Sequence, residues 1–466
     1  MTTVLWRRWY NSILSRKQIV PASRARPRRQ RLVLEALDDR LTPTLTPQMV
    51  LDINQASSNP SQMVVIGSTT YFAADDGVHG VELWKTDGTT AGTVLVKDIG
   101  PGSSRSNLGN LTNVNGTLFF SASDGAGIEL WKTDGTAAGT VPVKSLADFP
   151  TDLTNVNGTL FFSGGDGPTG YELWKSDGTA AGTVLVKDIY PGSHPGFYFD
   201  YPNSSYPGNL TNVNGTLFFS ATDGTNGREL WKSDGTEAGT VLVKDIAADR
   251  TDSYPSNLTN VNGILYFSAW QDSTLGLELW KSDGTAAGTT LVRDINPGGA
   301  RSYPTSLTNV NGTLFFTADD GTHGTELWKS DGTEAGTTLV KDINPGSGSS
   351  SLTSLTNVNG TLFFSVDDGT HGRELWKSDG TAVGTDLVAN LSPASLANVN
   401  GTLFLSADDG TSGYELWKSD GTNAGTVLVK DIYRDIPSSS PTSLTDVNGT
   451  LFFAAYDRMT GYELWK

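Results

Sequence analysis

The sequence predicts an all-β protein, a single closed β-propeller built from nine repeats that each form a four-stranded blade. The tetrapeptide Glu-Leu-Trp-Lys recurs nine times at intervals of 41 to 57 residues, which is the period of a supersecondary unit. Asp-Gly-Thr turn signals follow eight of these copies, and Asn-Gly pairs precede eight of them. The ninth copy ends the chain at Lys466 without a final strand, and a matching segment occurs at 49–54.

The composition favours strands and turns over helices. The chain has 466 residues, which is enough to bury a sizeable core, with 53 glycines and only 18% charged residues. It has no cysteine, so disulfides, thiolate metal sites and thiol nucleophiles are excluded. No apolar run approaches the ~18 residues that a membrane-spanning helix needs, so we expect no transmembrane segment.

Charge is distributed unevenly along the chain. The formal net charge is −17, but residues 1–40 hold ten Lys and Arg against three Asp and Glu, so the remaining residues carry −24. An acidic body repels phosphate backbones, and we therefore expect no nucleic-acid partner for the propeller.

Residues 1–47 are predicted to be a basic, mostly disordered leader. The stretch RARPRRQRLVLEALDDRLTPTLTP resembles the Arg-rich opening and L-E-x-L-E-x-R-x-x-P pattern of predicted exported proteins of planctomycete bacteria. The matching positions are Leu34, Glu35, Leu37, Arg40 and Pro43, with Asp38 where the pattern usually has Glu. The resemblance implies export to the cell surface or the extracellular space; the alternative is a plain disordered tail.

Each repeat contains four predicted strands, labelled A to D. In the repeat around 357–381, Asn359-Gly360 separates two apolar runs, and this pair favours a two-residue type I′ hairpin between strands A and B. A D-G-T-x-G loop then leads to strand C, which is ELWK, and S-D-G-T-x-A-G-T turns into strand D. Leu362 and Phe364 alternate with Phe363, so both faces of the sheet are apolar and must be covered by neighbouring repeats.

The two ends of the repeat region predict a closed ring rather than an open stack. MVLDIN at 49–54 aligns with LVKDIN at 339–344, so we expect Met49 to Ile53 to pair with Glu463 to Lys466 and to complete the last blade. Closure removes open sheet edges, as in WD-repeat propellers. The propeller is predicted to span 48–466. Strand A occurs nine times, around Val65, Val114, Val156, Val213, Val261, Val310, Val358, Val399 and Val447.

The repeat resembles the bacterial ELWxxDGT repeat family over about 90% of the chain. Propeller-like repeats are what the resemblance implies for the fold. It implies little about activity, because that family is defined by its repeat and not by a known reaction.

Residues that break the repeat are the candidates for chemistry, because catalysis requires one constellation rather than nine equal ones. His79, His323 and His371 occupy the same slot of the loop between strands B and C, where an exposed loop residue is the alternative to a metal ligand. Paired aspartates in these loops offer oxygen donors to Ca²⁺, but Asp before Gly-Thr is also ordinary turn chemistry. Otherwise we expect no cofactor.

Two further features are interpreted from residue type. Glu82 and its eight counterparts in ELWK share a strand face with Trp, and we interpret them as structural hydrogen-bond acceptors. Residues 190–208 form the one clear insertion, in the connection between strand D and the next strand A. Because that connection and the B–C loop emerge on one face of a propeller, we predict one ligand patch consisting of Phe197, Tyr198, Phe199, Tyr201, Tyr206, Tyr254, Trp270 and Asp272.

These observations predict an exported or surface-attached, non-catalytic propeller that serves as a binding scaffold. The expected ligand is a glycan or a protein that stacks on the aromatic patch; the alternative for the patch is an insertion that packs on itself. The alternative function is a propeller enzyme, a lyase or hydrolase of polysaccharide, with Asp272 or Asp200 as the acid.

Overall fold

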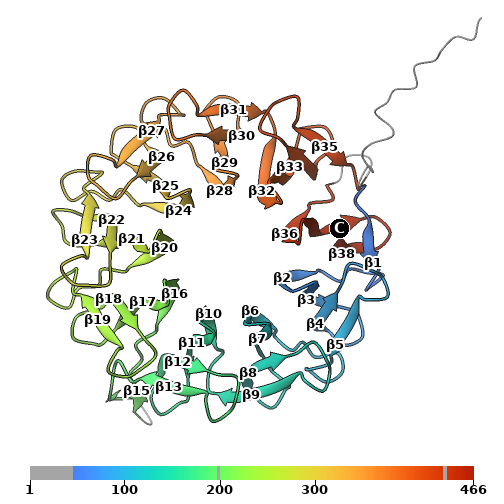
Figure 1. The fold of residues 1–466 in the computed structure, drawn as a ribbon, viewed down its shortest axis with the longest axis horizontal. Helices are drawn as coiled ribbons and strands as arrows, with labels where there is room; N and C mark the ends of the chain where they lie inside the picture. Colours follow the sequence, from blue (N-terminus) through green and yellow to red (C-terminus); the bar gives the residue numbers. More distant parts are fainter. Residues whose placement is uncertain (1–45, 197–199, 434–437) are drawn as a thin grey trace, which may run out of the picture. The chain divides into compact units, whose positions relative to one another are not determined.

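The computed structural model describes residues 46–196, 200–433 and 438–466 (Figure 1). The predicted leader therefore lies, up to Leu45, outside the described residues. The same holds for Phe197, Tyr198 and Phe199 of the predicted patch. The described residues contain strands and turns but no helix, and hence no helix long and apolar enough to span a membrane.

The unit 46–466 contains nine four-stranded antiparallel sheets, which confirms the predicted blade. We number the blades in chain order of their strand A. The A strands are β2 (Ser61–Ile66), β6 (Gly109–Val114), β10 (Thr151–Val156), β16 (Gly208–Val213), β20 (Ser256–Val261), β24 (Thr305–Val310), β28 (Thr353–Val358), β32 (Ser392–Val399) and β36 (Thr442–Val447). The B strands are β3 (Thr69–Asp75), β7 (Thr117–Ala122), β11 (Thr159–Gly165), β17 (Thr216–Thr222), β21 (Ile264–Trp270), β25 (Thr313–Asp319), β29 (Thr361–Asp367), β33 (Thr402–Asp408) and β37 (Thr450–Asp457).

The outer strands complete each sheet. The C strands are β4 (Val81–Thr86), β8 (Ile128–Thr133), β12 (Tyr171–Ser176), β18 (Arg228–Ser233), β22 (Leu277–Ser282), β26 (Thr325–Ser330), β30 (Arg373–Ser378), β34 (Tyr414–Ser419) and β38 (Gly461–Trp465). The D strands are β5 (Val94–Lys97), β9 (Val141–Leu146), β13 (Val184–Lys187), β19 (Val241–Lys244), β23 (Thr290–Arg293), β27 (Thr338–Lys341), β31 (Asp386–Ala389), β35 (Val427–Lys430) and β1 (Met49–Leu51). A small extra hairpin, β14 (Ser193–His194) and β15 (Tyr201–Pro202), lies in the insertion.

The Asn-Gly pairs adopt the predicted hairpin turns. Asn359 and Gly360 have φ of 51° and 87°, the left-handed values that a type I′ turn requires at both central positions. The turn fixes the register of β28 against β29, in which Val358 faces Thr361. Register in turn decides which side chains face each neighbouring blade.

The blades form a ring, with strand A innermost and strand D outermost (Figure 1). The core lies between adjacent blades: Tyr266 and Leu279 of blade 5 pack with Phe316 and Trp328 of blade 6. Phe316 is fully buried. Burying a ring of this size contributes several kcal/mol gross, roughly 25 cal/mol per Å² over about 150–250 Å². The sheets are therefore covered on both faces, as predicted.

The ring is closed by the N-terminal strand of the described chain. The sheet order is β1-β38-β37-β36, with Met49 opposite Trp465. Gln48 and Lys466 exchange two backbone N–H to O hydrogen bonds of 2.9 Å each. Val50 packs in a core cluster that joins blade 9 to blade 1. The predicted closure is confirmed.

Candidate functional site

The glutamate of the ELWK motif holds the connection that leads into the next blade. In blade 5, Glu278 is fully buried and accepts hydrogen bonds from the N–H of Ile295 (2.9 Å), the N–H of Ser302 (3.0 Å) and the hydroxyl of Ser302 (2.6 Å). Burial raises the pKa of Glu278 to about 7, against the opposing effect of those hydrogen bonds. These contacts bear out the interpretation of this glutamate as a structural acceptor.

The same arrangement recurs around the ring. In seven blades the glutamate accepts the N–H of the isoleucine that follows strand D, and the pairs are Glu82–Ile99, Glu172–Ile189, Glu229–Ile246, Glu278–Ile295, Glu326–Ile343, Glu415–Ile432 and Glu463–Ile53. We call this arrangement the glutamate clamp. The last pair joins the two ends of the propeller, so closure uses the same device as every clamped blade.

The clamp holds a serine of the connection, such as Ser302, and the residue directly after this serine lies at the corner where the next blade begins. In blades 4, 5 and 6 this residue is tyrosine: Tyr206, Tyr254 and Tyr303 have φ of 46°, 47° and 47° and are 57%, 57% and 54% exposed. A bulky aromatic residue in left-handed backbone is strained, and such strain is found at functional sites. In blades 1 and 2 the equivalent residues are Asn59 and Asn107, which tolerate this conformation. We call the three tyrosines the tyrosine rim.

Charged and aromatic groups surround the rim. The ring of Tyr206 stacks on Tyr171 at 5.8 Å between centroids. The Nη1 of Arg228 donates to the carbonyl of Tyr206 at 2.8 Å. A hydrogen bond to Asp252 raises the pKa of the Tyr254 phenol.

The third tyrosine has a cation beside it. The Arg301 guanidinium lies 6.0 Å from the ring centre of Tyr303. Rings flanked by hydrogen-bonding groups can stack on a sugar and hold its hydroxyls.

Trp270 of the predicted patch lies beside the rim. It ends β21 and is half-buried, and its backbone N–H donates to the backbone carbonyl of Ser253 at 2.8 Å. Because Ser253 precedes Tyr254, this bond joins the B–C loop of blade 5 to the corner that carries the tyrosine. The same bond joins Asp319 to Ser302 in blade 6. The two kinds of connection therefore share one face, as predicted.

The insertion contributes a separate aromatic pair. Tyr201 is 48% exposed and stacks on His194 across the β14–β15 hairpin at 5.9 Å, whereas the ring of Tyr206 stacks on Tyr171. The described part of the insertion thus packs partly on itself, which was the alternative to a ligand patch. Asp200, the residue before Tyr201, is exposed.

The Asp272 carboxylate forms hydrogen bonds within its own loop. Its Oδ1 accepts hydrogen bonds from the N–H and hydroxyl of Thr274 (2.7 and 2.6 Å) and from the N–H of Leu275 (3.0 Å). The bonds from Thr274 lower the pKa of the Asp272 carboxyl. A general acid must hold its proton near neutral pH, so this environment opposes that role.

Tyr303 was missing from the predicted patch. The signal that could have found it is the tripeptide Ser-Tyr-Pro, which occurs at 205–207, 253–255 and 302–304. The first copy drew notice because it lies at the end of the insertion. The third copy follows a connection without an insertion, so it is recognised only by its equivalence to the other two copies.

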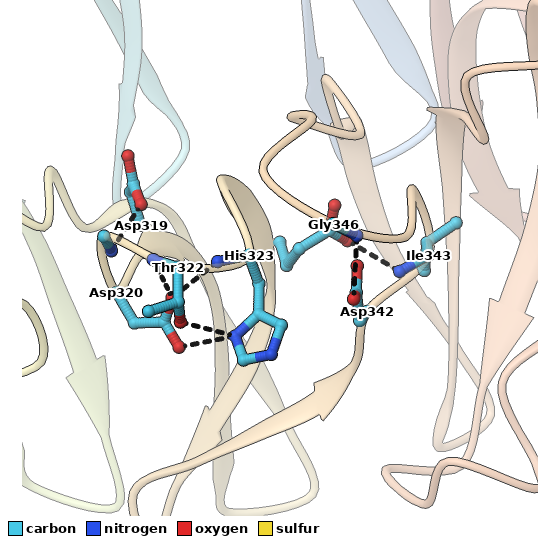
Figure 2. Close-up of polar contacts among 9 residues, drawn as sticks. Asp319, Asp320, Thr322, His323, Asp342, Ile343 and Gly346 are labelled. Atoms are coloured by element: carbon cyan, nitrogen blue, oxygen red, sulfur yellow. Dashed lines mark hydrogen bonds and ion pairs between the residues drawn. The ribbon is translucent and has the colours of Figure 1, made fainter.

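The paired aspartates form turns within the B–C loops. Figure 2 shows the loop of blade 6, where Asp319 Oδ1 accepts the N–H of Gly321 and Asp320 Oδ1 accepts the N–H groups of Thr322 and His323. Hydrogen bonds from His323 and Thr322 outweigh burial and lower the pKa of Asp320 to about 2. These contacts are those of Asx turns. Calcium binding at these loops stays a prediction.

The three repeat histidines do not share one site. His79, His323 and His371 each contact an aspartate three residues earlier in their own loop, at 2.7, 2.8 and 2.8 Å. Each loop must therefore be judged by its own neighbours.

Comparison with known proteins finds solved structures that are only weakly similar to this chain. No protein-family model matches it, and no curated protein sequence matches it. A puromycin hydrolase, solved as its S511A mutant complexed with PGG, is 14% identical with a TM-score of 0.41, over 87% of this chain and 59% of that one. The chain thus spans about three fifths of the length of that protein.

Two further solved structures give similar values. A prolyl endopeptidase is 12% identical with a TM-score of 0.42, over 78% of this chain and 56% of that one. The β-propeller domain of the Trilobed protease from Pyrococcus furiosus, described as having an open velcro topology, is 10% identical with a TM-score of 0.37, over 70% of this chain and 96% of that one. Similarities of this size say nothing of the activity of this chain.

Proposed function

We propose that the chain is an exported, non-catalytic propeller of the ELWxxDGT type that binds a ligand through the tyrosine rim, and that this ligand is a glycan. The observation that carries the proposal is the set of three strained, exposed tyrosines at equivalent corners of consecutive blades. The resemblance of the leader to those of exported proteins supports an extracellular or surface location. A protein ligand is the alternative outcome of the test.

The rim has the chemistry that sugar binding requires. A tyrosine ring offers an apolar face for the C–H groups of a pyranose, while Arg228, Asp252 and Arg301 supply donors and acceptors beside the rings. Spacing the rings over three blades suits a chain of several sugar units. A polysaccharide enzyme with Asp272 as its acid is not favoured, because the Asp272 carboxylate accepts hydrogen bonds from Thr274 within its own turn.

The test is a glycan array followed by calorimetry with the full chain. The triple variant Tyr206→Asn, Tyr254→Asn and Tyr303→Asn removes the rings but keeps residues that suit these corners, since Asn59 and Asn107 occupy them elsewhere. With each of the three rings contributing roughly 1 kcal/mol, we expect affinity to fall on the order of 100-fold. The control is Ser351→Asn, at the equivalent exposed corner of blade 7.

Three outcomes would contradict this proposal. Unchanged glycan affinity in the triple variant would place the binding surface elsewhere. Release of a shortened glycan would show an enzyme. Capture of a protein in place of any glycan, lost in the triple variant, would keep the rim but change its ligand.

A further inference from the structure

Blade 7 has lost the hydrogen bonds of the glutamate clamp. Its connection from strand D to the next strand A is seven residues shorter than that of blade 6, measured between the matching segments 386–399 and 338–358. Leu391, the residue that replaces Ile343, donates its N–H to the carbonyl of Ala389 at 2.9 Å. In blade 6, Ile343 donates its N–H to Glu326 at 3.0 Å. The short connection therefore turns this donor away from the glutamate of blade 7.

Glu374, the ELWK glutamate of blade 7, consequently has a free oxygen. The residue is 1% exposed, and its Oε2 accepts the indole N–H of Trp376 at 2.9 Å. Its Oε1 is buried with no hydrogen-bond partner in the described structure. A buried, unpaired carboxylate oxygen is costly, and such groups are normally found paired or on a metal.

The free oxygen faces a histidine and a second carboxylate. Glu374 Oε1 lies 3.9 Å from Nδ1 of His371, and the same nitrogen lies 2.8 Å from Oδ2 of Asp368. One ligand atom from each of these residues lies within 4.8 Å of the others. Ligands bonded to a tetrahedral Zn²⁺ at 2.0–2.1 Å lie roughly 3.3 Å apart, so small shifts would seat an ion among these three atoms.

We propose that Asp368, His371 and Glu374 bind a divalent transition-metal cation, with Zn²⁺ as the ion that suits them best. One imidazole nitrogen and two carboxylate oxygens match the nitrogen and oxygen preference of Zn²⁺, and the charge of two carboxylates attracts a cation. On binding, the proton on Nδ1 of His371 passes to solvent while Nε2 carries the one proton of the neutral ring, so that Nδ1 gives its lone pair to the ion. Three protein ligands leave a fourth position for a water molecule, and the His371 side chain is 63% exposed.

The cation that adjoins Glu374 in sequence has other partners. Arg373, which lies between His371 and Glu374 in sequence, directs its Nη1 to the hydroxyls of Thr353 (2.9 Å) and Ser365 (3.3 Å). Thr370 contributes a hydroxyl 2.8 Å from Nδ1 of His371, which adds an oxygen rather than a charge.

Two other blades each have only one of the two features, the loop histidine and the unpaired glutamate oxygen. In blade 6, His323 is present in the same loop, but Glu326 is occupied by the N–H groups of Ile343 and Asn344 and by the hydroxyl of Ser350. In blade 2, Glu129 also has an unpaired oxygen, but its loop at 123–128 contains no histidine. Blade 7 has both the histidine and the free glutamate.

The test is titration of the metal-free full chain with Zn²⁺ by calorimetry, with Co²⁺ absorption as a second readout. We expect one site per chain, and Co²⁺ bands typical of nitrogen and oxygen ligands. His371→Ala and Glu374→Gln should each weaken binding by at least about tenfold. His323→Ala is the matched control, because it removes a histidine from the same motif in a blade whose glutamate is occupied, and it should bind as the wild type does.

A graft of the longer connection keeps the three ligands and tests whether the short connection of blade 7 makes Glu374 available to the metal. Residues 389–394 are replaced by residues 341–353 of blade 6, which restores the isoleucine and serine donors, so Zn²⁺ affinity should fall as in Glu374→Gln. The proposal is overturned by absence of binding, by several equal weak sites, by equal loss in His323→Ala, or by wild-type affinity in Glu374→Gln or the graft. Circular dichroism of each variant confirms that the fold is retained.

Discussion

Blades 6 and 7 carry almost the same sequence but give the same glutamate opposite surroundings. From the paired aspartates to the ELWK lysine they read DDGTHGTELWK and DDGTHGRELWK, differing only at Thr325 and Arg373. Glu326 is surrounded by three donors, whereas Glu374 keeps one unpaired oxygen. The difference shows that a repeat motif does not define the chemistry of its residues, because their partners come from the connection to the next blade.

The comparison also separates two roles of one residue. In blade 6 the glutamate stabilises the ring, because it ties strand C to the corner that begins blade 7. In blade 7 that task is gone, since a shorter connection makes its own hydrogen bond between Leu391 and Ala389. The glutamate is then available for another partner.

Removing each glutamate gives the largest expected effect. Glu326→Ala leaves three donors of blade 6 without an acceptor, at roughly 1–3 kcal/mol each, so we expect the free energy of unfolding to fall by about 3 kcal/mol or more. Glu374→Ala removes the acceptor of one indole N–H and should cost about 2 kcal/mol less than the blade 6 variant. Denaturant unfolding of both variants measures the difference. Equal losses would show that the clamp contributes no stability beyond packing.

A pH titration tests the clamped glutamate by itself. Burial raises the pKa of Glu326 to about 7, above its ordinary value of 4.5. Between these values the unfolded chain releases the proton that the folded chain keeps, so this group's stabilising contribution is complete below about pH 4.5 and is lost as pH rises through about 7. Glu326→Gln should therefore remove a decline of up to ~1.4 kcal/mol per pH unit from the unfolding free energy.

The control for the pH experiment is Glu334→Gln, which removes an exposed carboxylate from the same blade. It should leave the decline in place. If the wild type instead gains stability over this range relative to Glu326→Gln, the donors of Ile343 and Ser350 stabilise the ionised carboxylate more than burial opposes it.

The smallest expected effect concerns the tryptophans beside the two glutamates. Trp376 donates its indole N–H to Glu374 at 2.9 Å, whereas the N–H of Trp328 has no partner in the described structure. Both rings lie near a cation, Lys341 at 5.2 Å and Arg293 at 5.8 Å. Trp376→Phe should therefore destabilise the chain by about 1 kcal/mol more than Trp328→Phe in thermal or denaturant unfolding. A larger loss from Trp328→Phe would contradict the assigned hydrogen bond.

The features of this protein that could be predicted from its sequence depend on neighbouring residues and on the repeat period. Asn-Gly pairs such as Asn359-Gly360 fix hairpins locally, apolar alternation specifies strands covered on both faces, and the displaced final strand specifies closure between Met49 and Trp465. Of the candidate ligand residues, Tyr206 and Tyr254 could be predicted from the sequence, together with the face of the propeller on which their connections lie. These features were predictable because each depends on a short stretch of chain or on counting repeats.

Which groups meet across the connections between blades depends on the three-dimensional path of the chain. The partners of Glu326 lie 17 to 24 residues away, and the direction of a backbone N–H there depends on the length of the connection and the path it takes. For the same reason the exposure of Tyr303, which follows from its place after the clamped Ser302, could not be predicted from the sequence, and neither could the difference between His371 and His323. Hydrogen bonds extend about 3 Å and depend on angle, so a seven-residue difference elsewhere in the chain changes an identical motif from a structural clamp into a candidate metal site.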